Sequence, residues 1–259
     1  MRQRVVTALI ALSLLAAVLF VLPAVFAAGV IAALVLAGAW EWSAFLATPS
    51  VVIRFIFVAL IALLLAAFSI QFAAFGPALL MLSLGWWFIA MIWTFFFPTS
   101  IPIAVRWLAG IFVLVPLHVA LMILYDVAPA TLLFALVVVW VADSGAYFAG
   151  KKFGRVKLAP KISPGKTWEG VIGGLVAVAL LIVVRSFWAE TNLAFLLPFC
   201  LGVASLSVIG DLTVSMFKRD AGVKDSGTLF PGHGGVLDRI DSVAAAAPLF
   251  ALGVSWVGL

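Results

Sequence analysis

Charged residues are scarce in this sequence. Aspartate, glutamate, lysine and arginine make up 10% of its 259 residues, whereas hydrophobic residues make up 66%. Soluble domains carry about 25% charged residues, so this composition excludes an ordinary soluble protein. Apolar runs recur along the chain, and an α-helix needs about 20 apolar residues to cross a bilayer. The sequence therefore predicts a polytopic membrane protein made of α-helices.

Cysteine and histidine are also nearly absent. The single cysteine, Cys200, lies in an apolar run, which excludes an intramolecular disulfide and argues against a cysteine-based metal site. His233 lies between two glycines without a cysteine or a second histidine nearby, so we expect no zinc site there. Outside the membrane-bound loops the chain has no basic face with interleaved aromatic residues, and we therefore expect no nucleic-acid partner.

Nine apolar segments are long enough to predict transmembrane helices. They cover residues 5–21, 24–47, 52–70, 75–97, 104–124, 129–149, 167–187, 193–218 and 236–258. The first segment resembles a secretory signal, but a retained helix is the simpler interpretation because eight more segments follow it. We expect an all-α, polytopic integral membrane protein with about nine transmembrane helices.

The basic residues predict the orientation of these helices, because lysine and arginine accumulate in cytoplasmic connections. With the N-terminus inside, only Arg185 of the fifteen basic residues falls on the outer side. The inner connections then hold Arg2, Arg4, Arg54, Arg106, the run from Lys151 to Lys166, the run from Lys218 to Lys224, and Arg239. The net charge of +5 suits anionic lipid head groups or phosphates. We therefore expect the N-terminus on the cytoplasmic side and the C-terminus outside.

Charge is unevenly distributed along the chain. Residues 1–142 carry six charged side chains, and the stretch from Asp143 to Asp241 carries the other nineteen. We therefore divide the chain into a transmembrane scaffold with a dimer surface, residues 1–128, and a catalytic transmembrane region with cytoplasmic polar loops, residues 129–259. Glu41 lies within the second apolar segment, where we expect a structural hydrogen bond to a neighbouring helix rather than a role in a site.

The first of three polar clusters covers residues 141–155. Asp143 is about two turns from the inner end of its predicted helix, and Tyr147 shares its face at the i+4 position. A carboxylate at that depth needs a counter-charge, a metal ion or a proton. The alternative is a carboxylate paired at a helix end without a role in a site.

The second cluster covers residues 157–174. The letters GKT at 165–167 suggest a Walker A motif, but Pro160 stands where that motif needs glycine. Ser163 followed by Pro164 is typical of a helix N-cap and the first helical position. Free backbone N–H groups and Lys166 would then face an anion at a helix start. The alternative is a basic loop that faces anionic lipid.

The third cluster covers residues 210–242 and begins on a predicted helix. On that helix Asp211, Ser215 and Lys218 share a face, with Arg219 beside Lys218. Asp220 lies off this face, where we expect it to be in solvent.

The next predicted helix carries Asp238, Asp241 and Ser242 on one face. Two membrane helices would thus bring Asp211 and Asp238 to the same inner rim. If these carboxylates have no cationic partner they repel anionic substrates, so we expect a bound cation there. Such oxygen ligands suit Mg²⁺, which uses one or two carboxylates together with waters and substrate phosphates.

These clusters carry a resemblance to a known family. The stretch SMFKRDAGVKDSGTLFPGHGGVLDRID, residues 215–241, resembles the signature of the bacterial phosphatidate cytidylyltransferases, also called CDP-diacylglycerol synthases. DSGAY at 143–147 and SPGKTWEG at 163–170 resemble the two other blocks of that family, in the same order. The first half is similar only in being a run of helices.

The resemblance implies a multi-pass enzyme of the bacterial inner membrane whose active site faces the cytoplasm. Such an enzyme transfers CMP from CTP to phosphatidic acid, forms CDP-diacylglycerol and pyrophosphate, and requires Mg²⁺. The resemblance also suggests a homodimer, and a second, monovalent cation is conceivable beside Mg²⁺.

The resemblance further implies roles for individual residues. The catalytic group would be Asp211, Asp238, Lys218 and Arg219. The metal ligands would be Asp211, Asp238 and Asp241. The substrate contacts would be Ser163, Lys166, Ser215, Lys224, Asp225, His233, Arg239 and Asp143.

Two other functions compete with this interpretation. A CTP-dependent kinase of polyprenol or dolichol would also need Mg²⁺ and an acceptor in the membrane, but the long third cluster argues against it. A transporter usually has paired halves and broken helices near the membrane midplane. In this chain the charges gather at one rim and in one half, which argues against transport.

Overall fold

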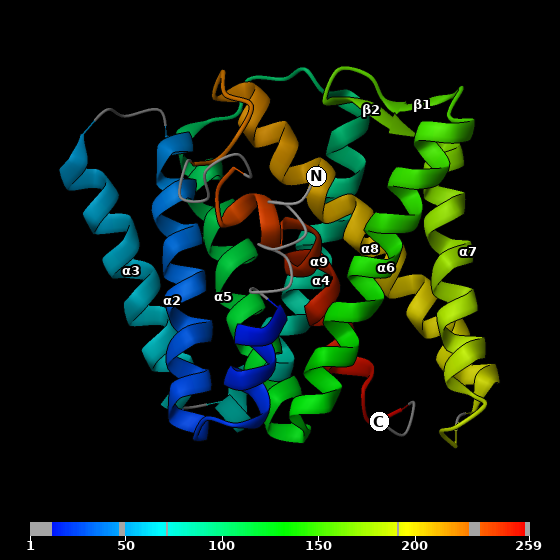
Figure 1. The fold of residues 1–259 in the computed structure, drawn as a ribbon. Helices are drawn as coiled ribbons and strands as arrows, with labels where there is room; N and C mark the ends of the chain where they lie inside the picture. Colours follow the sequence, from blue (N-terminus) through cyan, green and yellow to red (C-terminus); the bar gives the residue numbers. More distant parts are fainter. Residues whose placement is uncertain (1–11, 47–49, 71, 191, 228–233, 257–259) are drawn as a thin grey trace.

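The structure is a bundle of long helices. The computed structural model describes residues 12–46, 50–70, 72–190, 192–227 and 234–256 (Figure 1). Residues 12–20 are helical, and the labelled helices are α2 (Ala24–Trp42), the 3₁₀ helix η1 (Ser43–Leu46), α3 (Val51–Ile70), α4 (Phe72–Phe96), α5 (Ile103–Val127), α6 (Pro129–Phe153), α7 (Trp168–Arg185), α8 (Leu193–Asp220) and α9 (Leu237–Gly253).

The helices follow the predicted apolar segments. Within the described residues, seven helices are long and apolar enough to cross a membrane: α2 continued by η1, and α3 to α8. The 17-residue α9 lies inside the ninth predicted segment and ends at Gly253, before the predicted end at residue 258. The prediction of a polytopic, mainly helical membrane protein is thus confirmed, whereas the count of nine crossings stays a prediction.

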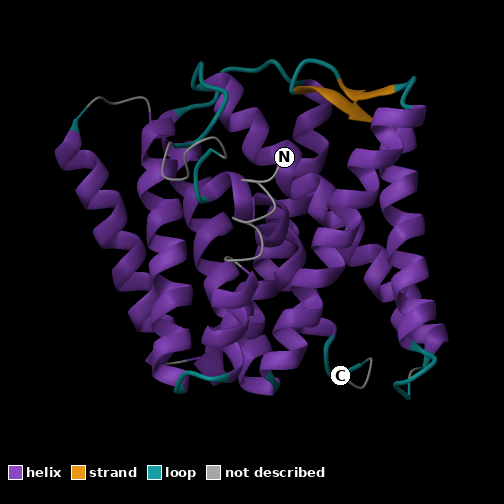
Figure 2. Ribbon diagram, viewed as in Figure 1, coloured by secondary structure: helices purple, strands orange, loops and turns teal. Residues whose placement is uncertain are grey.

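A short hairpin interrupts the helical fold between α6 and α7 (Figure 2). Its strands β1 (Lys157–Ala159) and β2 (Ser163–Thr167) pair antiparallel. The prediction that Ser163 caps a helix is therefore wrong, and the mainly helical fold contains one short hairpin that was not predicted. A residue before proline favours an extended conformation, which suits both a helix N-cap and a strand. The pairing of Ser163 with Ala159 of β1 places it in a strand. The N-cap of α7 is Thr167, whose hydroxyl accepts a hydrogen bond from the backbone N–H of Gly170.

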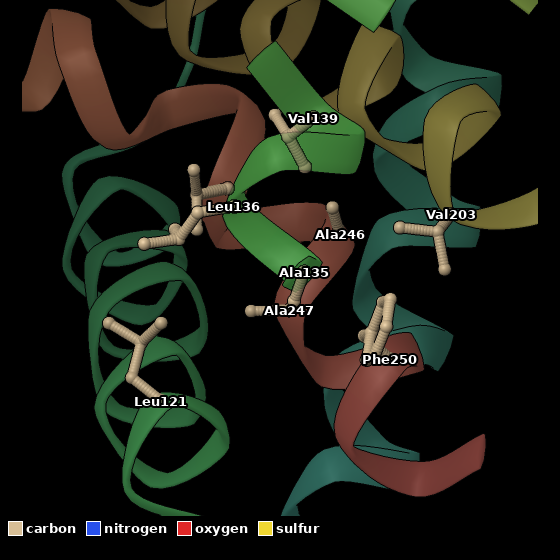
Figure 3. A pocket seen from close by; sticks show the side chains of 9 residues that line it. Leu121, Ala135, Leu136, Val139, Val203, Ala246, Ala247 and Phe250 are labelled. Carbon is tan, nitrogen blue, oxygen red and sulfur yellow. The ribbon is translucent and has the colours of Figure 1, made fainter. Parts of the chain in front are cut away.

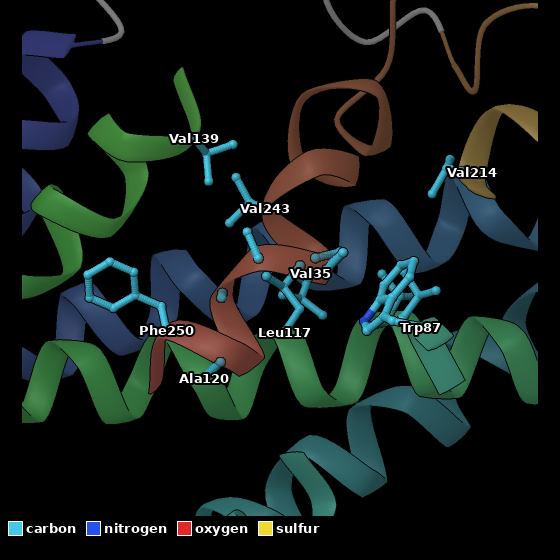
Figure 4. Close-up of a cluster of buried hydrophobic side chains, with 14 of the residues drawn as sticks. Val35, Trp87, Leu117, Ala120, Val139, Val214, Val243 and Phe250 are labelled. Carbon is cyan, nitrogen blue, oxygen red and sulfur yellow. The ribbon is translucent and has the colours of Figure 1, made fainter. Parts of the chain in front are cut away.

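Helix α9 lies in the middle of the bundle. Every residue from Asp241 to Pro248 is buried, and a helix buried on all sides belongs to the core. Figure 4 shows Val243 and Phe250 of α9 among buried side chains from α2, α4, α5, α6 and α8. Small residues let α8 approach α9 closely, because Gly210 sits against the carbonyl group of Asp241 and the side chain of Ala245. The polar ends of α8 and α9 are thereby held side by side.

Glycines also bring α6 and α7 close together. A Cβ atom on Gly173 would overlap Ala149, and one on Gly174 would overlap the backbone carbonyl of Ala142. Close approach of this kind is typical of small residues between membrane helices. The packing fixes the hairpin, which connects the two helices, relative to the end of α6.

The helix ends that carry basic residues lie on one side of the bundle. In Figure 1 the first turns of α3, α5 and α7, the last turns of α6 and α8, and the hairpin are all at the upper side. Arg185 lies in the last turn of α7, at the opposite end of that helix. The basic residues in the helix turns at the upper side are Arg54, Arg106, Lys151, Lys152, Lys218 and Arg219. This grouping is the one that the positive-inside argument requires; the side of the membrane that it faces stays a prediction.

Candidate active site

Asp211 of α8 is bonded to two other residues of the polar sequence clusters. Its carboxylate accepts a hydrogen bond from the hydroxyl group of Ser215, one turn along the same helix, at 3.1 Å. The shared helix face predicted for these two residues is thereby confirmed. The other oxygen lies 2.6 Å from the ammonium group of Lys166 in β2. The hairpin and α8 are thus joined by an ion pair.

Asp238, in the first turn of α9, forms the second ion pair of the region. One of its carboxylate oxygens lies 2.6 Å from the ammonium group of Lys218, and both side chains are about nine-tenths buried. The other oxygen accepts hydrogen bonds from the backbone N–H groups of Ser226 and Gly235, each at 3.0 Å. Gly234 precedes this turn with φ +80°, a conformation that glycine adopts without strain. The carboxylate of Asp238 therefore holds two points of the α8–α9 connection, Ser226 and Gly235.

The condition under which Asp211 and Asp238 would repel anionic substrates is not met, because both carboxylates have cationic partners. Each carboxylate has its own lysine, Lys166 for Asp211 and Lys218 for Asp238. Helical spacing shows which side chains of one helix share a face. It does not show that β2 brings Lys166 to Asp211, or that α8 brings Lys218 to Asp238.

Two further aspartates lie next to Asp211. Asp143 of α6 and Asp241 of α9 are both close enough to interact electrostatically with it. The Ser242 backbone N–H donates to Asp241 at 2.8 Å, and the Ser242 side chain lies within interaction range of Asp143. Asp241 is buried and Asp143 is exposed. We call the whole group the polar site: Asp143, Lys166, Asp211, Ser215, Lys218, Asp238, Asp241 and Ser242.

The charges of the polar site do not balance. It contains four carboxylates and two ammonium groups, so its titratable side chains leave two negative charges when all are ionised. Among the described residues, no three acidic, histidine or cysteine side chains converge to hold a metal ion by themselves. Mg²⁺ does not need such a group, because it binds through one or two carboxylates and completes its shell with water and substrate phosphates. The oxygen donors of the polar site fit an ion of this kind.

Asp211 and Asp238 differ in how many lone-pair positions of the carboxylate remain free to bind a cation. A carboxylate has about four lone-pair positions. Asp238 already accepts three hydrogen bonds, from Lys218, Ser226 and Gly235. The bonds described for Asp211 are those from Lys166 and Ser215. Asp211 therefore has more room for a metal ion than Asp238.

Several predicted site residues lie outside the polar site. The guanidinium group of Arg219 turns toward the hairpin and donates to the backbone carbonyl of Ile162 at 3.0 Å. Ser163 is half-buried in β2. Tyr147, which was not among the predicted site residues, is exposed with its ring against Phe148. The exposed members of the set are Lys224, Asp225 and Arg239. His233 lies outside the described residues.

Glu41 of α2 connects the first half of the chain to this region. Its carboxylate accepts hydrogen bonds from the hydroxyl group of Ser226 and from the backbone N–H groups of Val236 and Leu237, at 2.8, 2.9 and 2.8 Å. The prediction of a structural hydrogen bond to a neighbouring helix is confirmed, because Leu237 begins α9. The contact with Ser226 was not predicted; the only hint in the sequence is the carboxylate inside an apolar segment.

Asp220 has a different environment from the one predicted. Its carboxylate lies 2.6 Å from the guanidinium group of Arg106 in α5, and its side chain is 14% exposed. The expectation that Asp220 is in solvent is therefore wrong. Arg106 also donates to the backbone carbonyls of Phe45 and Ile101. Sequence reasoning missed this pair because its members are far apart in the chain and belong to different predicted halves.

An apolar pocket lies between α5, α6, α8 and α9 (Figure 3). Its labelled lining side chains, among them Leu121, Leu136 and Phe250, carry no charge. A pocket lined in this way has no group to neutralise a polyphosphate. The polar site, rather than this pocket, has the chemistry for an anionic ligand.

The comparisons with known proteins agree with this chemistry. Residues 2–257 match the model of the cytidylyltransferase family. The chain belongs to this family. The phosphatidate cytidylyltransferase of Pseudomonas aeruginosa is 41% identical to it over 260 residues, covering 97% of this chain and 96% of the relative.

Two other relatives have the same name. The phosphatidate cytidylyltransferase of Haemophilus influenzae is 34% identical over 280 residues, covering 97% of each chain. That of Brucella suis is 48% identical over 129 residues, covering 47% of this chain and 46% of the relative. The resemblance found in the sequence is thereby confirmed, and the similarity includes the first half of the chain.

Proposed function

We propose that this chain transfers CMP from CTP to phosphatidic acid and releases pyrophosphate. The observation that carries the proposal is the similarity, over 97% of the chain, to a protein named phosphatidate cytidylyltransferase. The polar site supports the proposal, because its residues come from all three sequence blocks that resemble the family. Asp143 belongs to the block at 143–147, Lys166 to the block at 163–170, and Lys218 and Asp238 to the block at 215–241.

The reaction joins two anionic substrates. An oxygen of the phosphatidate phosphate attacks the α-phosphorus of CTP, and the bond between the α- and β-phosphates breaks as pyrophosphate leaves. The product is CDP-diacylglycerol. No covalent intermediate on the protein is needed, so the contribution of the chain is to position the phosphates and to stabilise their charge.

Lys166 and Lys218 supply charge at fixed positions. Each ammonium group has three N–H donors, and the ion pair with Asp211 or Asp238 occupies one of them. The remaining donors can bind phosphate oxygens. Because a carboxylate already holds each ammonium group in place, little reorganisation is needed when substrate arrives.

We also propose that Asp211 and Asp241, with Asp143 beside them, hold a Mg²⁺ ion. When bound, this ion supplies positive charge at the phosphate oxygens of the transferred group. Asp238 belongs to the predicted ligand set as well, but its three accepted hydrogen bonds favour a role in orienting Lys218. The excess negative charge of the polar site leaves room for a second, monovalent cation.

The location of the site follows from the same proposal. CTP is a cytoplasmic substrate, so the side that carries the hairpin and the basic helix ends would face the cytoplasm, in the inner membrane of a bacterium. The N-terminus would then lie inside and the chain would cross the membrane nine times. We further propose a homodimer; exposed apolar side chains on α3 and α4, such as Leu63 and Phe88, fit contact with either lipid or a second copy.

One assay tests the proposed reaction and its alternatives. Purified protein in mixed micelles should release pyrophosphate only when CTP, phosphatidic acid and Mg²⁺ are all present. With CTP labelled in its cytosine, the lipid product should carry the label. A polyprenol-type kinase would instead leave a phosphorylated alcohol without cytosine, and a transporter would move a solute into proteoliposomes without consuming CTP.

A further inference from the structure

We propose that Glu41 is a positioning residue for the polar site. In this inference, which rests on the proposed function, Glu41 fixes the connection between α8 and α9 and thereby orients Asp238 and Lys218. Glu41 acts from α2, far from the sequence clusters that carry the resemblance.

Glu41 and Asp238 hold the same two points of the chain. At the first point, the hydroxyl group of Ser226 donates to Glu41 at 2.8 Å while its backbone N–H donates to Asp238 at 3.0 Å. At the second point, the backbone N–H of Gly235 donates to Asp238 and that of Val236 donates to Glu41, at 3.0 and 2.9 Å. The two carboxylates therefore share one framework of donors.

The described residues of the connection lie closely around the Glu41 carboxylate. Glu41 is 7% exposed. Gly227 and Gly235 lie so close to it that a Cβ atom on either would overlap carboxylate atoms. The bond from Leu237 places the carboxylate at the start of α9, where the helix dipole stabilises negative charge. A buried carboxylate with these donors is costly to replace, because its loss leaves backbone N–H groups without an acceptor.

The influence of Glu41 reaches the site through a short series of contacts. Ser226 and Gly235 connect it to Asp238, and Asp238 connects to Lys218 at 2.6 Å. Lys218 in turn interacts electrostatically with Asp211 and Asp241. A displacement of the connection would therefore move an ammonium group that the proposed mechanism needs in a fixed position, and misplacement by about 1 Å can cost about a hundredfold in rate.

A double-mutant cycle distinguishes positioning from a general effect on folding. Glu41→Gln keeps the size of the side chain but replaces one carboxylate oxygen with an NH₂ group. This group is a donor and cannot accept the hydrogen bonds that Glu41 accepts from Ser226, Val236 and Leu237. We expect the kcat of this variant to fall by roughly tenfold or more in the wild-type background. In the Asp238→Asn background the further loss should be less than about twofold, because residues that act as a unit are not additive.

The cycle has one control and one further test variant. Asp126→Asn, an exposed carboxylate at the end of α5, should leave kcat unchanged in both backgrounds. Ser226→Ala removes one donor to Glu41 but keeps the backbone bond to Asp238, so it should give a smaller loss with the same lack of additivity. If Glu41→Gln does not accumulate in the membrane, Ser226→Ala provides the test by itself.

The outcomes separate this inference from the proposed function. If the wild-type protein shows no pyrophosphate release that depends on CTP and phosphatidate, the proposed function fails. If the wild-type protein is active but the losses from Glu41→Gln or Ser226→Ala multiply with that from Asp238→Asn, Glu41 only supports the fold and the inference is wrong. Unchanged kcat in these variants would overturn it as well.

Discussion

The guanidinium group of Arg106 lies 2.6 Å from the carboxylate of Asp220. This ion pair joins the first turn of α5 to the last residue of α8. Both side chains are more than four-fifths buried. Arg106 donates in addition to the carbonyls of Phe45 and Ile101. A single arginine of the first half thus fixes the end of the helix that carries Asp211 and Lys218.

Asp220→Asn should consequently destabilise the protein. Removing one partner from a buried ion pair leaves the other charge uncompensated, and we expect a loss of about 3–5 kcal/mol in the free energy of unfolding. The measurement is thermal unfolding of the purified protein in detergent. Asp126→Asn, at an exposed position, should leave the midpoint unchanged. An Asp220→Asn midpoint equal to that of the wild type would show that the pair contributes nothing.

Asp211→Asn and Asp238→Asn should both impair catalysis, but they should differ in their response to Mg²⁺. We expect each to cut activity by at least roughly a hundredfold, the scale of losing a main electrostatic element. Asp211 has the greater capacity for a cation, so Asp211→Asn should raise the Mg²⁺ concentration needed for half-maximal rate. Asp238→Asn should raise it less, because its oxygens mainly hold Lys218 and the backbone.

Mg²⁺ titrations of the residual activity decide this point. Near-normal rates and an unchanged Mg²⁺ dependence in both variants would exclude these two aspartates as the metal site. Asp143 and Asp241, which lie beside Asp211, would then be the next pair to substitute.

Lys166→Ala should weaken the use of a phosphate-bearing substrate. The substitution removes an ammonium group that is 25% exposed and leaves Asp211 without its ion-pair partner, so an extra negative charge faces the incoming phosphates. We expect a higher KM for CTP and a lower kcat, with normal insertion into the membrane. Lys161→Ala, an exposed lysine of the same hairpin, is the matched control. Wild-type kinetics in Lys166→Ala would reduce the hairpin to a basic loop that faces lipid.

Cysteine labelling should place the hairpin and the α8–α9 connection on the cytoplasmic side. Lys157 and Lys224 are exposed, so cysteines there should react with an impermeant thiol reagent only after the membrane is opened. A cysteine at the exposed Trp188, beyond the other end of α7, should react in intact cells. Gly227 is a poor labelling position, because any Cβ atom there would overlap Glu41. Labelling of residue 157 from outside would contradict the proposed orientation.

Local patterns in the sequence predicted the elements well. Apolar runs located the helices because length and hydrophobicity are what a bilayer requires. Helical spacing placed Asp211 and Ser215 on one face, and the structure shows their hydrogen bond. Ser163 was assigned wrongly because serine before proline fits both a helix cap and a strand, and pairing with β1 decided between them.

The partners of the charged residues were much less predictable. Lys166 reaches Asp211 from a hairpin, Arg106 reaches Asp220 from α5, and Glu41 reaches Ser226 from α2. Each contact depends on how elements distant in sequence pack in three dimensions. Periodicity describes one helix at a time and contains no such information.

The central position of α9 has a consequence for biosynthesis. This helix follows the other described helices in the sequence, yet it supplies Asp238, Asp241 and one backbone donor to Glu41, the N–H group of Leu237. While the ribosome is still making it, the earlier helices can enter the membrane, but Glu41 and Asp211 lack part of their surroundings. The ion pair of Lys218 with Asp238 and the bond from Leu237 to Glu41 can therefore form only after residues 237–253 have been made and packed against α5 and α8.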